Sequence, residues 1–270
     1  MRRIVYGDRV KIALMDSGIG LLPAAAAVRQ LRPDADLVLS WDPDGMPWGP
    51  RTPEDITVRS LAVAEAAARH RPDVLIVACN TASVHSLLAL RARFEPDLPI
   101  IGTVPAIKPA AAGGGPVAIW ATPATTRSPY QRGLIREFAD GVTVTEVPCP
   151  GLADAVHHAD ESAIDAAIAA AAALTPDDVT TVVLGCTNYE LVAQRIRAAV
   201  QKPGLPPLVL HGSAGAVAAQ ALRRIGERPV AEAAADPALT VILSGREGGL
   251  PATALTYAEG RLLHAVSPAR

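Results

Sequence analysis

The sequence predicts an α/β fold with mainly parallel strands, because short apolar runs alternate with helical patterns along most of its 270 residues. Two of these runs resemble each other: residues 74–81 and 182–188 both end in a small residue, a cysteine and a polar tail. A helical pattern follows each run, which is typical of a buried parallel strand. We therefore expect Cys79 and Cys186 at the carboxyl ends of central strands, where open α/β sheets bind ligands.

The individual elements follow from β-branched and aliphatic runs, which predict strands, and from longer periodic segments, which predict helices. The expected strands lie at residues 11–16, 37–41, 74–79, 100–104, 117–121, 142–147, 181–186, 208–211 and 239–244. The expected helices lie at residues 22–32, 53–70, 82–94, 124–139, 160–174, 189–200 and 213–226.

Proline, glycine and acidic residues indicate where some of these elements begin or end. The second helix begins at Thr52 or Pro53, since proline is tolerated in a first turn and the acidic residues that follow suit the positive end of the helix dipole. Three glycines and a proline at residues 113–116 form the clearest flexible break, where one domain could pass to another. The tail from Arg246 is expected to be partly irregular.

The composition excludes several classes of protein. Net charge is −2, from 25 basic and 27 acidic residues, so neither nucleic acid nor an anionic membrane is expected as a main partner. The 3 cysteines have no framework spacing, which argues against a disulfide-stabilised secreted domain. The longest apolar stretch, residues 166–174, is far below the roughly 20 residues of a membrane span. No apolar segment follows the charged N-terminal residues, so we expect no signal peptide and a cytoplasmic protein.

The two similar cysteines indicate proton transfer rather than a structural role. Thiols at equivalent edges of two half-structures could face one substrate from opposite sides. Further polar groups follow other expected strands, namely Asp16-Ser17-Gly18, Pro47-Trp48-Gly49, Thr122, Thr125, Ser128, Tyr130 and His157-His158.

Structural roles are the alternative for these residues. Buried free cysteines are common in protein cores, and Asp16 could be the N-cap of a helix. Trp48 is equally consistent with an ordinary core residue, and His157 with a solvated loop. For Cys149 we expect packing at a strand end.

The motifs resemble those of the glutamate racemases, in the aspartate/glutamate racemase superfamily, and the likeness runs from about Ile12 to about Val200 in the family's order and spacing. Cys79-Asn80-Thr81-Ala82-Ser83 is identical to the family's first cysteine motif, and Gly185-Cys186-Thr187 matches the start of its second. The other similar segments are Asp16–Gly20, like the opening motif, Pro47–Gly49, like a Pro-Tyr-Gly segment, and Thr125–Tyr130, loosely like an Ala-Thr-x-x-Ser-x-x-Tyr region.

The resemblance implies two α/β domains with the active site in the cleft between them. Residues 1–102 plus 213–270 would form the first domain, and residues 103–212 the second. It also implies a homodimer, an amino acid as the small-molecule partner, and neither a metal nor pyridoxal phosphate. A pyridoxal enzyme would need a Schiff-base lysine, whereas Lys108 and Lys202 fall in proline-flanked loops of the expected structure.

The implied reaction removes the α-proton of an amino acid on one face and returns a proton on the other. Cys79 and Cys186 would be the two bases, with Asp16 assisting Cys79, because a thiol with an ordinary pKa of about 8.5 must be shifted to act as a thiolate. The implied substrate contacts are Asn80, Thr81 and Thr187 for the α-carboxylate, Ser17 with the Pro47, Trp48 and Gly49 segment for the distal end, and Thr122, Thr125 and Asn188 as further candidates.

Some positions depart from the family pattern. The second cysteine motif usually continues with His-Tyr-Pro, but here Asn188 and Glu190 replace the histidine and the proline. The family's glutamate eight residues after a Cys-Pro pair is His157 here, which could serve the second thiol because its pKa lies near neutrality. Leu21 replaces a glycine and Trp48 a tyrosine.

Glutamate is the favoured substrate, and D-glutamate for the peptidoglycan precursor would be the product. The enzyme alternatives are an aspartate racemase, a racemase of another amino acid, and a maleate-isomerase-like enzyme of the same superfamily. The alternative from another class is a non-catalytic ligand-binding or regulatory protein, which Asn188 and His157 favour.

Overall fold

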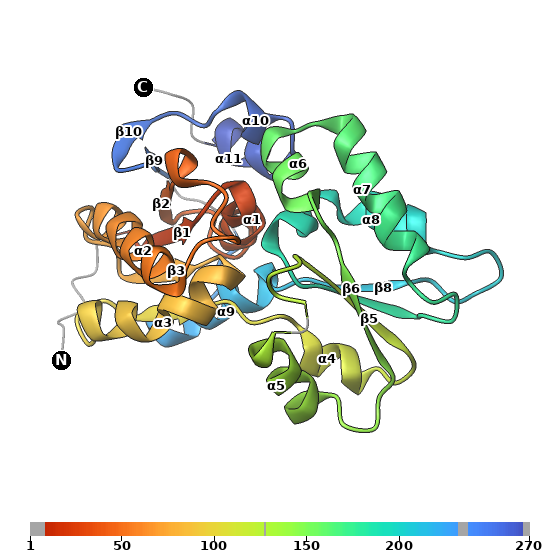
Figure 1. The fold of residues 1–270 in the computed structure, drawn as a ribbon. Helices are drawn as coiled ribbons and strands as arrows, with labels where there is room; N and C mark the ends of the chain where they lie inside the picture. The colour runs from red at the N-terminus through yellow and green to blue at the C-terminus, as the bar shows by residue number, and fades with distance from the viewer. Residues whose placement is uncertain (1–8, 127, 232–236, 267–270) are drawn as a thin grey trace.

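The computed structural model describes residues 9–126, 128–231 and 237–266, and it contains two open sheets (Figure 1). In spatial order, the six-stranded sheet consists of β10 (Arg246–Gly248), β9 (Leu239–Leu243), β2 (Asp36–Trp41), β1 (Lys11–Asp16), β3 (Val74–Val77) and β4 (Ile100–Gly102). The four-stranded sheet consists of β6 (Val144–Pro148), β5 (Val117–Ala121), β7 (Thr181–Leu184) and β8 (Val209–His211). Among these strands only β9 and β10 pair antiparallel, so the predicted α/β class with mainly parallel sheets is confirmed.

Helices cover both faces of the six-stranded sheet. Successive side chains of a strand point to opposite faces, so Ile12 and Leu14 pack toward α1 (Leu22–Leu31) and α9 (Ala214–Arg224). Ala13 and Met15 pack toward α2 (Pro53–Ala68) and α3 (Asn80–Phe94). The predicted start of α2 is confirmed, since the Thr52 hydroxyl accepts a hydrogen bond from the Asp55 N–H group.

The four-stranded sheet is covered in the same way. Val117 and Ile119 face α4 (Ile107–Ala112) and α5 (Pro129–Phe138). Ala118 and Trp120 face the side of α6, α7, α8 and the 3₁₀ helix η3. These four helices span Leu152–His158, Glu161–Ala173, Ala193–Val200 and Thr187–Val192, respectively.

One cluster of buried side chains runs through both halves of the molecule. It includes Leu14 and Leu39 of the first sheet, Leu21 of η1 (Ile19–Leu21), Tyr189 of η3 and Trp120 of the second sheet. The segments that follow the strands are therefore packed into a shared core, and this packing fixes one sheet edge relative to the other.

The two cysteines leave their strands earlier than the sequence predicts. β3 ends at Val77 and β7 at Leu184, so Cys79 and Cys186 each lie two residues beyond a strand. Both strands are interior members of their sheets, as expected for the apolar runs that form them.

Several short helices are not predicted by the sequence, because elements of four to nine residues give too little periodic signal. α4 lies just before the expected break, in a segment for which the sequence predicts no element, and α6 places His157 and His158 in a helix rather than a loop. The tail, predicted to be partly irregular, contains β10, α10 (Ala252–Leu255) and α11 (Ala258–Val266). The helix predicted at 124–139 begins only at Pro129, and the one predicted at 189–200 begins as η3.

The division of the chain into domains at 1–102 plus 213–270 and 103–212 stays a prediction. Strands of the first sheet come from residues 11–102 and 239–248, and those of the second from residues 117–211. Residues 1–8, on which the signal-peptide expectation depends, and residues 267–270 lie outside the described chain. Within the described helices, none has the length and apolar character needed to cross a membrane.

Candidate active site

A cavity of about 600 Å³ is lined by segments that follow strands of both sheets. In the first half, the lining comes from residues 16–17 at the end of β1 and from residues 46–50 and 79–81 after β2 and β3. In the second half, it comes from residues 122–125 after β5, from Cys149, Gly151, Ala153 and Asp154 after β6, and from residues 185–188 after β7. The carboxyl edges of the two sheets therefore face one space, which is where open α/β sheets bind ligands.

Every predicted site residue except His157 lines this cavity. These residues are Asp16, Ser17, Pro47, Trp48, Gly49, Cys79, Asn80, Thr81, Thr122, Thr125, Cys186, Thr187 and Asn188. Sequence patterns do not indicate the further lining residues Met46, Pro50, Pro123, Ala124, Cys149, Gly151, Ala153 and Asp154. Four of them, Met46, Pro50, Pro123 and Ala124, are chain neighbours of predicted residues, whereas the other four lie in or shortly before the short helix α6.

Both thiols have the same local backbone arrangement. Cys79 precedes α3 with φ −125° and ψ 121°. Cys186 precedes η3 with φ −133° and ψ 134°. Each cysteine is thus an extended residue between a buried strand and a helix, and both side chains border the same cavity.

Asp16 is a buried carboxylate beside the first thiol. Its Oδ1 atom accepts hydrogen bonds from the Ser17 N–H group at 2.6 Å and from the Ser17 hydroxyl at 3.1 Å. Burial raises the pKa of Asp16 to about 7, although hydrogen bonding from Cys79 and Ser17 lowers it in part. A carboxyl group that titrates near neutrality next to a thiol can exchange a proton with it.

Burial also raises the pKa of both thiols. For Cys79, the neighbouring Asp16 carboxylate raises the pKa further. For Cys186, burial raises the pKa to about 12. Ser17 Oγ lies 3.8 Å from Cys79 Sγ. Burial therefore favours the protonated form of both thiols, and a positive charge brought into the cavity would favour a thiolate.

Side chains connect the two halves directly beside the thiols. The side-chain amide of Asn80 donates to the Gly185 carbonyl oxygen at 2.9 Å, and the Thr187 hydroxyl donates to Asp16 Oδ2 at 3.3 Å. The two halves also approach closely at Gly20, where a Cβ atom would overlap the side chains of Thr187 and Asn188. The relative position of the thiols is thus set by contacts across the cavity.

Trp48 belongs both to the core and to the cavity wall. Its ring is buried among Met15 and Ile56, and its indole N–H group donates to Asp42 Oδ2 at 3.2 Å. The expected core position of Trp48 is therefore confirmed, and its role in substrate binding stays a prediction. The indole nitrogen is already paired within the protein, so the ring acts as an anchor of the wall.

The residues that replace the family's histidine and glutamate have different surroundings. Asn188 Nδ2 donates to the Ala153 carbonyl oxygen at 2.7 Å. The His157 ring lies against Gly18, burial lowers its pKa, and its Nδ1 atom is buried with no partner among the described residues. Asp154, from the same helix, borders the cavity instead. A role for His157 at the second thiol stays a prediction.

The other residues that the sequence analysis names mostly contact other parts of the protein. Cys149 borders the cavity, but its thiol lies in the core at 3.5 Å from the Val147 carbonyl oxygen. The hydroxyls of Thr122 and Thr125 are 3.2 Å apart. Leu21 is fully buried in the shared core.

The described residues contain no group of three or more His, Cys, Asp or Glu side chains placed to hold a metal ion. The chain has three lysines, and none is among the described residues that line the cavity. Lys108 lies in α4 rather than in a loop, with its Nζ atom over the Phe138 ring. Lys202 pairs with Asp177 at 2.9 Å.

Comparison with known proteins gives consistent matches. The family model described as Asp/Glu/Hydantoin racemase matches residues 24–221. The chain is 36% identical over 225 residues to a glutamate racemase of Roseiflexus sp. (strain RS-1), covering 80% of each protein. It is 38% identical over 219 residues to a glutamate racemase of Granulibacter bethesdensis, covering 78% of this chain and 77% of that protein. A crystal structure of Escherichia coli glutamate racemase in complex with L-glutamate and the activator UDP-MurNAc-ala superposes with a TM-score of 0.75, at 27% identity over 96% of each chain.

Proposed function

The chain belongs to the Asp/Glu/Hydantoin racemase family, and we propose that it is a glutamate racemase that interconverts L-glutamate and D-glutamate by a two-thiol mechanism. The observation that carries the proposal is that Cys79 and Cys186 border one cavity, each two residues beyond an interior strand of a different sheet. A substrate in this cavity has one thiol from each half of the molecule beside it.

In the first step, one cysteine thiolate takes the α-proton of the substrate. Asp16 is suited to receive the Cys79 proton beforehand, because its pKa of about 7 lies close to ambient pH. The ammonium group of the amino acid adds a positive charge to the cavity, which favours the thiolate. The negative charge that develops on the substrate is stabilised by hydrogen-bond donors at its carboxylate.

In the second step, the opposite thiol donates its proton to the other face of the α-carbon. The bond from sulfur to hydrogen breaks as the bond from carbon to hydrogen forms, so the configuration inverts and the second cysteine becomes the thiolate. Proton exchange with water then restores the starting state. In the reverse direction Cys186 takes the α-proton and Cys79 supplies one, which is consistent with the matching backbone of the two cysteines.

The other lining residues hold the substrate. Asn80, Thr81 and Thr187 are proposed to bind the α-carboxylate, and Ser17 with the segment from Pro47 to Gly49 to bind the distal carboxylate. Thr122, Thr125 and Asn188 are further candidate contacts on the side of the second sheet. The Asn80 Oδ1 atom is buried with no partner among the described residues, and as an acceptor it suits the ammonium group of the substrate, whereas the amide N–H suits the carboxylate.

The cellular setting follows from the proposed activity. D-Glutamate made in this way would supply a peptidoglycan precursor, so we propose that the enzyme acts in the cytoplasm in cell-wall synthesis. A homodimer and an active site that uses no cofactor are proposed with it.

Proton NMR in deuterated water tests the function. The protein is incubated separately with the L- and D-forms of glutamate and aspartate and with maleate, and chiral chromatography follows the products. Loss of the α-proton signal from both glutamate enantiomers, with formation of the opposite enantiomer, is expected. Turnover restricted to aspartate or maleate would assign one of the alternative activities. Calorimetric binding of glutamate without any exchange would identify a non-catalytic ligand-binding protein.

A further inference from the structure

Residues 46–50, here called the cavity wall, follow β2 and line the space between the sheets. We infer that Asp42, held in place by Ser244, is a positioning residue for this wall and thereby determines how tightly the distal end of the substrate is bound. The inference rests on the proposed function, because the substrate that the wall faces is the one proposed above.

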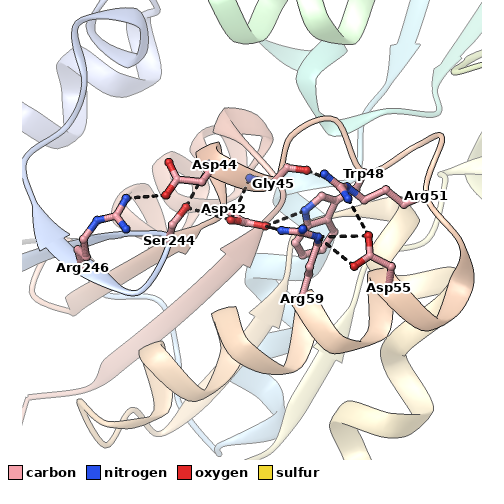
Figure 2. A network of polar contacts seen from close by, with 9 residues as sticks. All are labelled: Asp42, Asp44, Gly45, Trp48, Arg51, Asp55, Arg59, Ser244 and Arg246. Carbon is pink, nitrogen blue, oxygen red and sulfur yellow. Dashed lines mark hydrogen bonds and ion pairs between the residues drawn. The ribbon is translucent and has the colours of Figure 1, made fainter.

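Asp42 is a buried carboxylate with four hydrogen-bond donors around it (Figure 2). Its Oδ1 atom accepts from the Gly45 N–H group at 3.2 Å and from the Ser244 hydroxyl at 2.9 Å. Its Oδ2 atom accepts from Trp48 Nε1 at 3.2 Å and from Arg59 Nη1 at 2.9 Å. Of these donors, Gly45 belongs to the turn before the cavity wall, and Trp48 belongs to the wall itself. A satisfied buried network of this kind holds its members in one arrangement.

The turn between β2 and the wall is shaped around this carboxylate. A Cβ atom on Gly45 would overlap the side chains of Asp42 and Arg59, so only glycine fits there. The Gly45 carbonyl oxygen accepts from Arg51 Nε at 2.9 Å. The N–H group and the carbonyl group of Gly45 are thus both bound by side chains of the network (Figure 2).

Ser244 contributes a second, independent observation. It follows β9 near the carboxyl end of the chain and adopts a left-handed backbone with φ 46°, which is unfavourable for a residue other than glycine. Its N–H group donates to the Trp41 carbonyl oxygen at 2.8 Å, and its hydroxyl donates to Asp42 and accepts from the Asp44 N–H group at 3.1 Å. Such conformations persist where the surroundings impose them, and they are frequent at functional sites.

The network matters to the substrate because it holds the backbone N–H groups of the cavity wall. The indole N–H group of Trp48 is directed to Asp42 and cannot serve a ligand. In contrast, the backbone N–H groups of Trp48 and Gly49 have no partner among the described residues. Adjacent unpaired N–H groups bind carboxylates when their direction is fixed. Asp42 fixes the direction of these N–H groups through its hydrogen bond with the Trp48 side chain.

Three variants test the inference. Asp42→Asn replaces an acceptor with a donor at nearly constant volume. Ser244→Gly removes the hydroxyl while accepting the left-handed backbone, so its effect isolates the lost hydrogen bonds. Arg246→Ala is the matched control, because Arg246 pairs with the exposed Asp44 at the outer rim of the same network. Racemisation of L-glutamate is measured, together with amide hydrogen exchange of the peptide covering residues 43–50.

For Asp42→Asn and Ser244→Gly we expect KM to rise about tenfold with kcat changed less than about threefold, because uniform binding of the distal group is lost. Exchange in residues 43–50 should be faster in both variants and unchanged in Arg246→Ala. A merely structural role would reduce the active fraction and thus kcat without changing KM, and that result overturns the inference. Faster exchange with an unchanged KM overturns it as well.

Failure of the proposed function gives a different result. In that case the unmodified protein racemises no amino acid. The positioning role of Asp42 is then tested by hydrogen exchange in residues 43–50 and by calorimetric binding of glutamate. Faster exchange with about tenfold weaker binding in Asp42→Asn supports the positioning role. Exchange or binding equal to that of the unmodified protein overturns it.

Discussion

The side-chain amide of Asn80 donates a hydrogen bond of 2.9 Å to the carbonyl oxygen of Gly185, and each of these residues is the chain neighbour of one of the two thiols. The bond joins the start of α3, in the first half of the molecule, to the segment after β7 in the second half. It therefore acts on the distance between Cys79 and Cys186 more directly than any contact within one half.

Asn80→Ala is expected to lower the free energy of unfolding by about 1–3 kcal/mol, because the buried Gly185 carbonyl loses its donor. It should also lower kcat/KM, since a small error in the position of a catalytic group is costly. Denaturant unfolding and racemisation kinetics measure the two effects. Gln201→Ala is the control, because this half-buried side chain hydrogen-bonds only within residues 202–208 among the described residues and does not join the halves. Stability of Asn80→Ala equal to that of the unmodified protein would show that the bond does not join the halves.

Cys79→Ser and Cys186→Ser should each abolish racemisation, because a hydroxyl is far too weakly acidic to replace a thiol as the base. Exchange of the α-proton with deuterated solvent should persist in each variant for one enantiomer, and the enantiomer should differ between the two variants. Cys149→Ser is the matched control, because this thiol is held in the core. Exchange that survives in both variants for both enantiomers rules out the two-thiol mechanism.

Asp16→Asn should reduce kcat by about 10²- to 10⁴-fold, the usual contribution of a group that moves a proton. The unmodified enzyme should lose activity as pH falls through about 7, because protonated Asp16 can no longer accept the Cys79 proton. A pH profile of kcat/KM measures this acid limb, which Asp16→Asn should lack. An acid limb unchanged in the variant would assign the titration to another group.

The same carboxyl group should make stability depend on pH. Its pKa is raised from 3.8 to about 7 by folding, so the native state holds a proton that the unfolded chain has released. The contribution to stability is therefore complete below about pH 4 and is lost as pH rises to about 7, by roughly 4 kcal/mol in total. Denaturant unfolding of Asp16→Asn and of the unmodified protein between about pH 4 and pH 8 measures the difference. A difference in stability that does not change with pH contradicts the raised pKa.

Glu190→Ala is expected to lower the free energy of unfolding by about 1–2 kcal/mol, because Glu190 caps the start of α9 from a distant part of the chain. Its carboxylate accepts from the Ser213 N–H group at 2.8 Å and from the Ala214 N–H group at 3.2 Å. Thermal unfolding measures the loss. Glu161→Ala, which removes an exposed ion pair with Arg195, should cost much less and is the control. Equal effects of the two substitutions would mean that the cap contributes nothing.

Local sequence patterns predict most of the fold and the two cysteines that border the cavity, whereas most of the other expected lining residues follow from the family resemblance. A buried strand needs an uninterrupted apolar run, and two such runs are enough to predict Cys79 and Cys186 at the edges of two sheets. Short elements give no comparable signal. The family pattern points to His157, eight residues after Cys149. Helix α6 is too brief to show a period, and Asp154 from this helix borders the cavity instead.

The sequence by itself thus determined which residues lie at the ends of the strands, because burial and hydrogen bonding dictate strands and helices over a few neighbouring residues. Only the tertiary structure decided which of these ends meet. Asn80 and Gly185 are 105 residues apart in the chain, and Asp42 and Ser244 are 202 apart. Contacts over such separations depend on how two whole sheets pack through a common core, and no local pattern of residues carries that information.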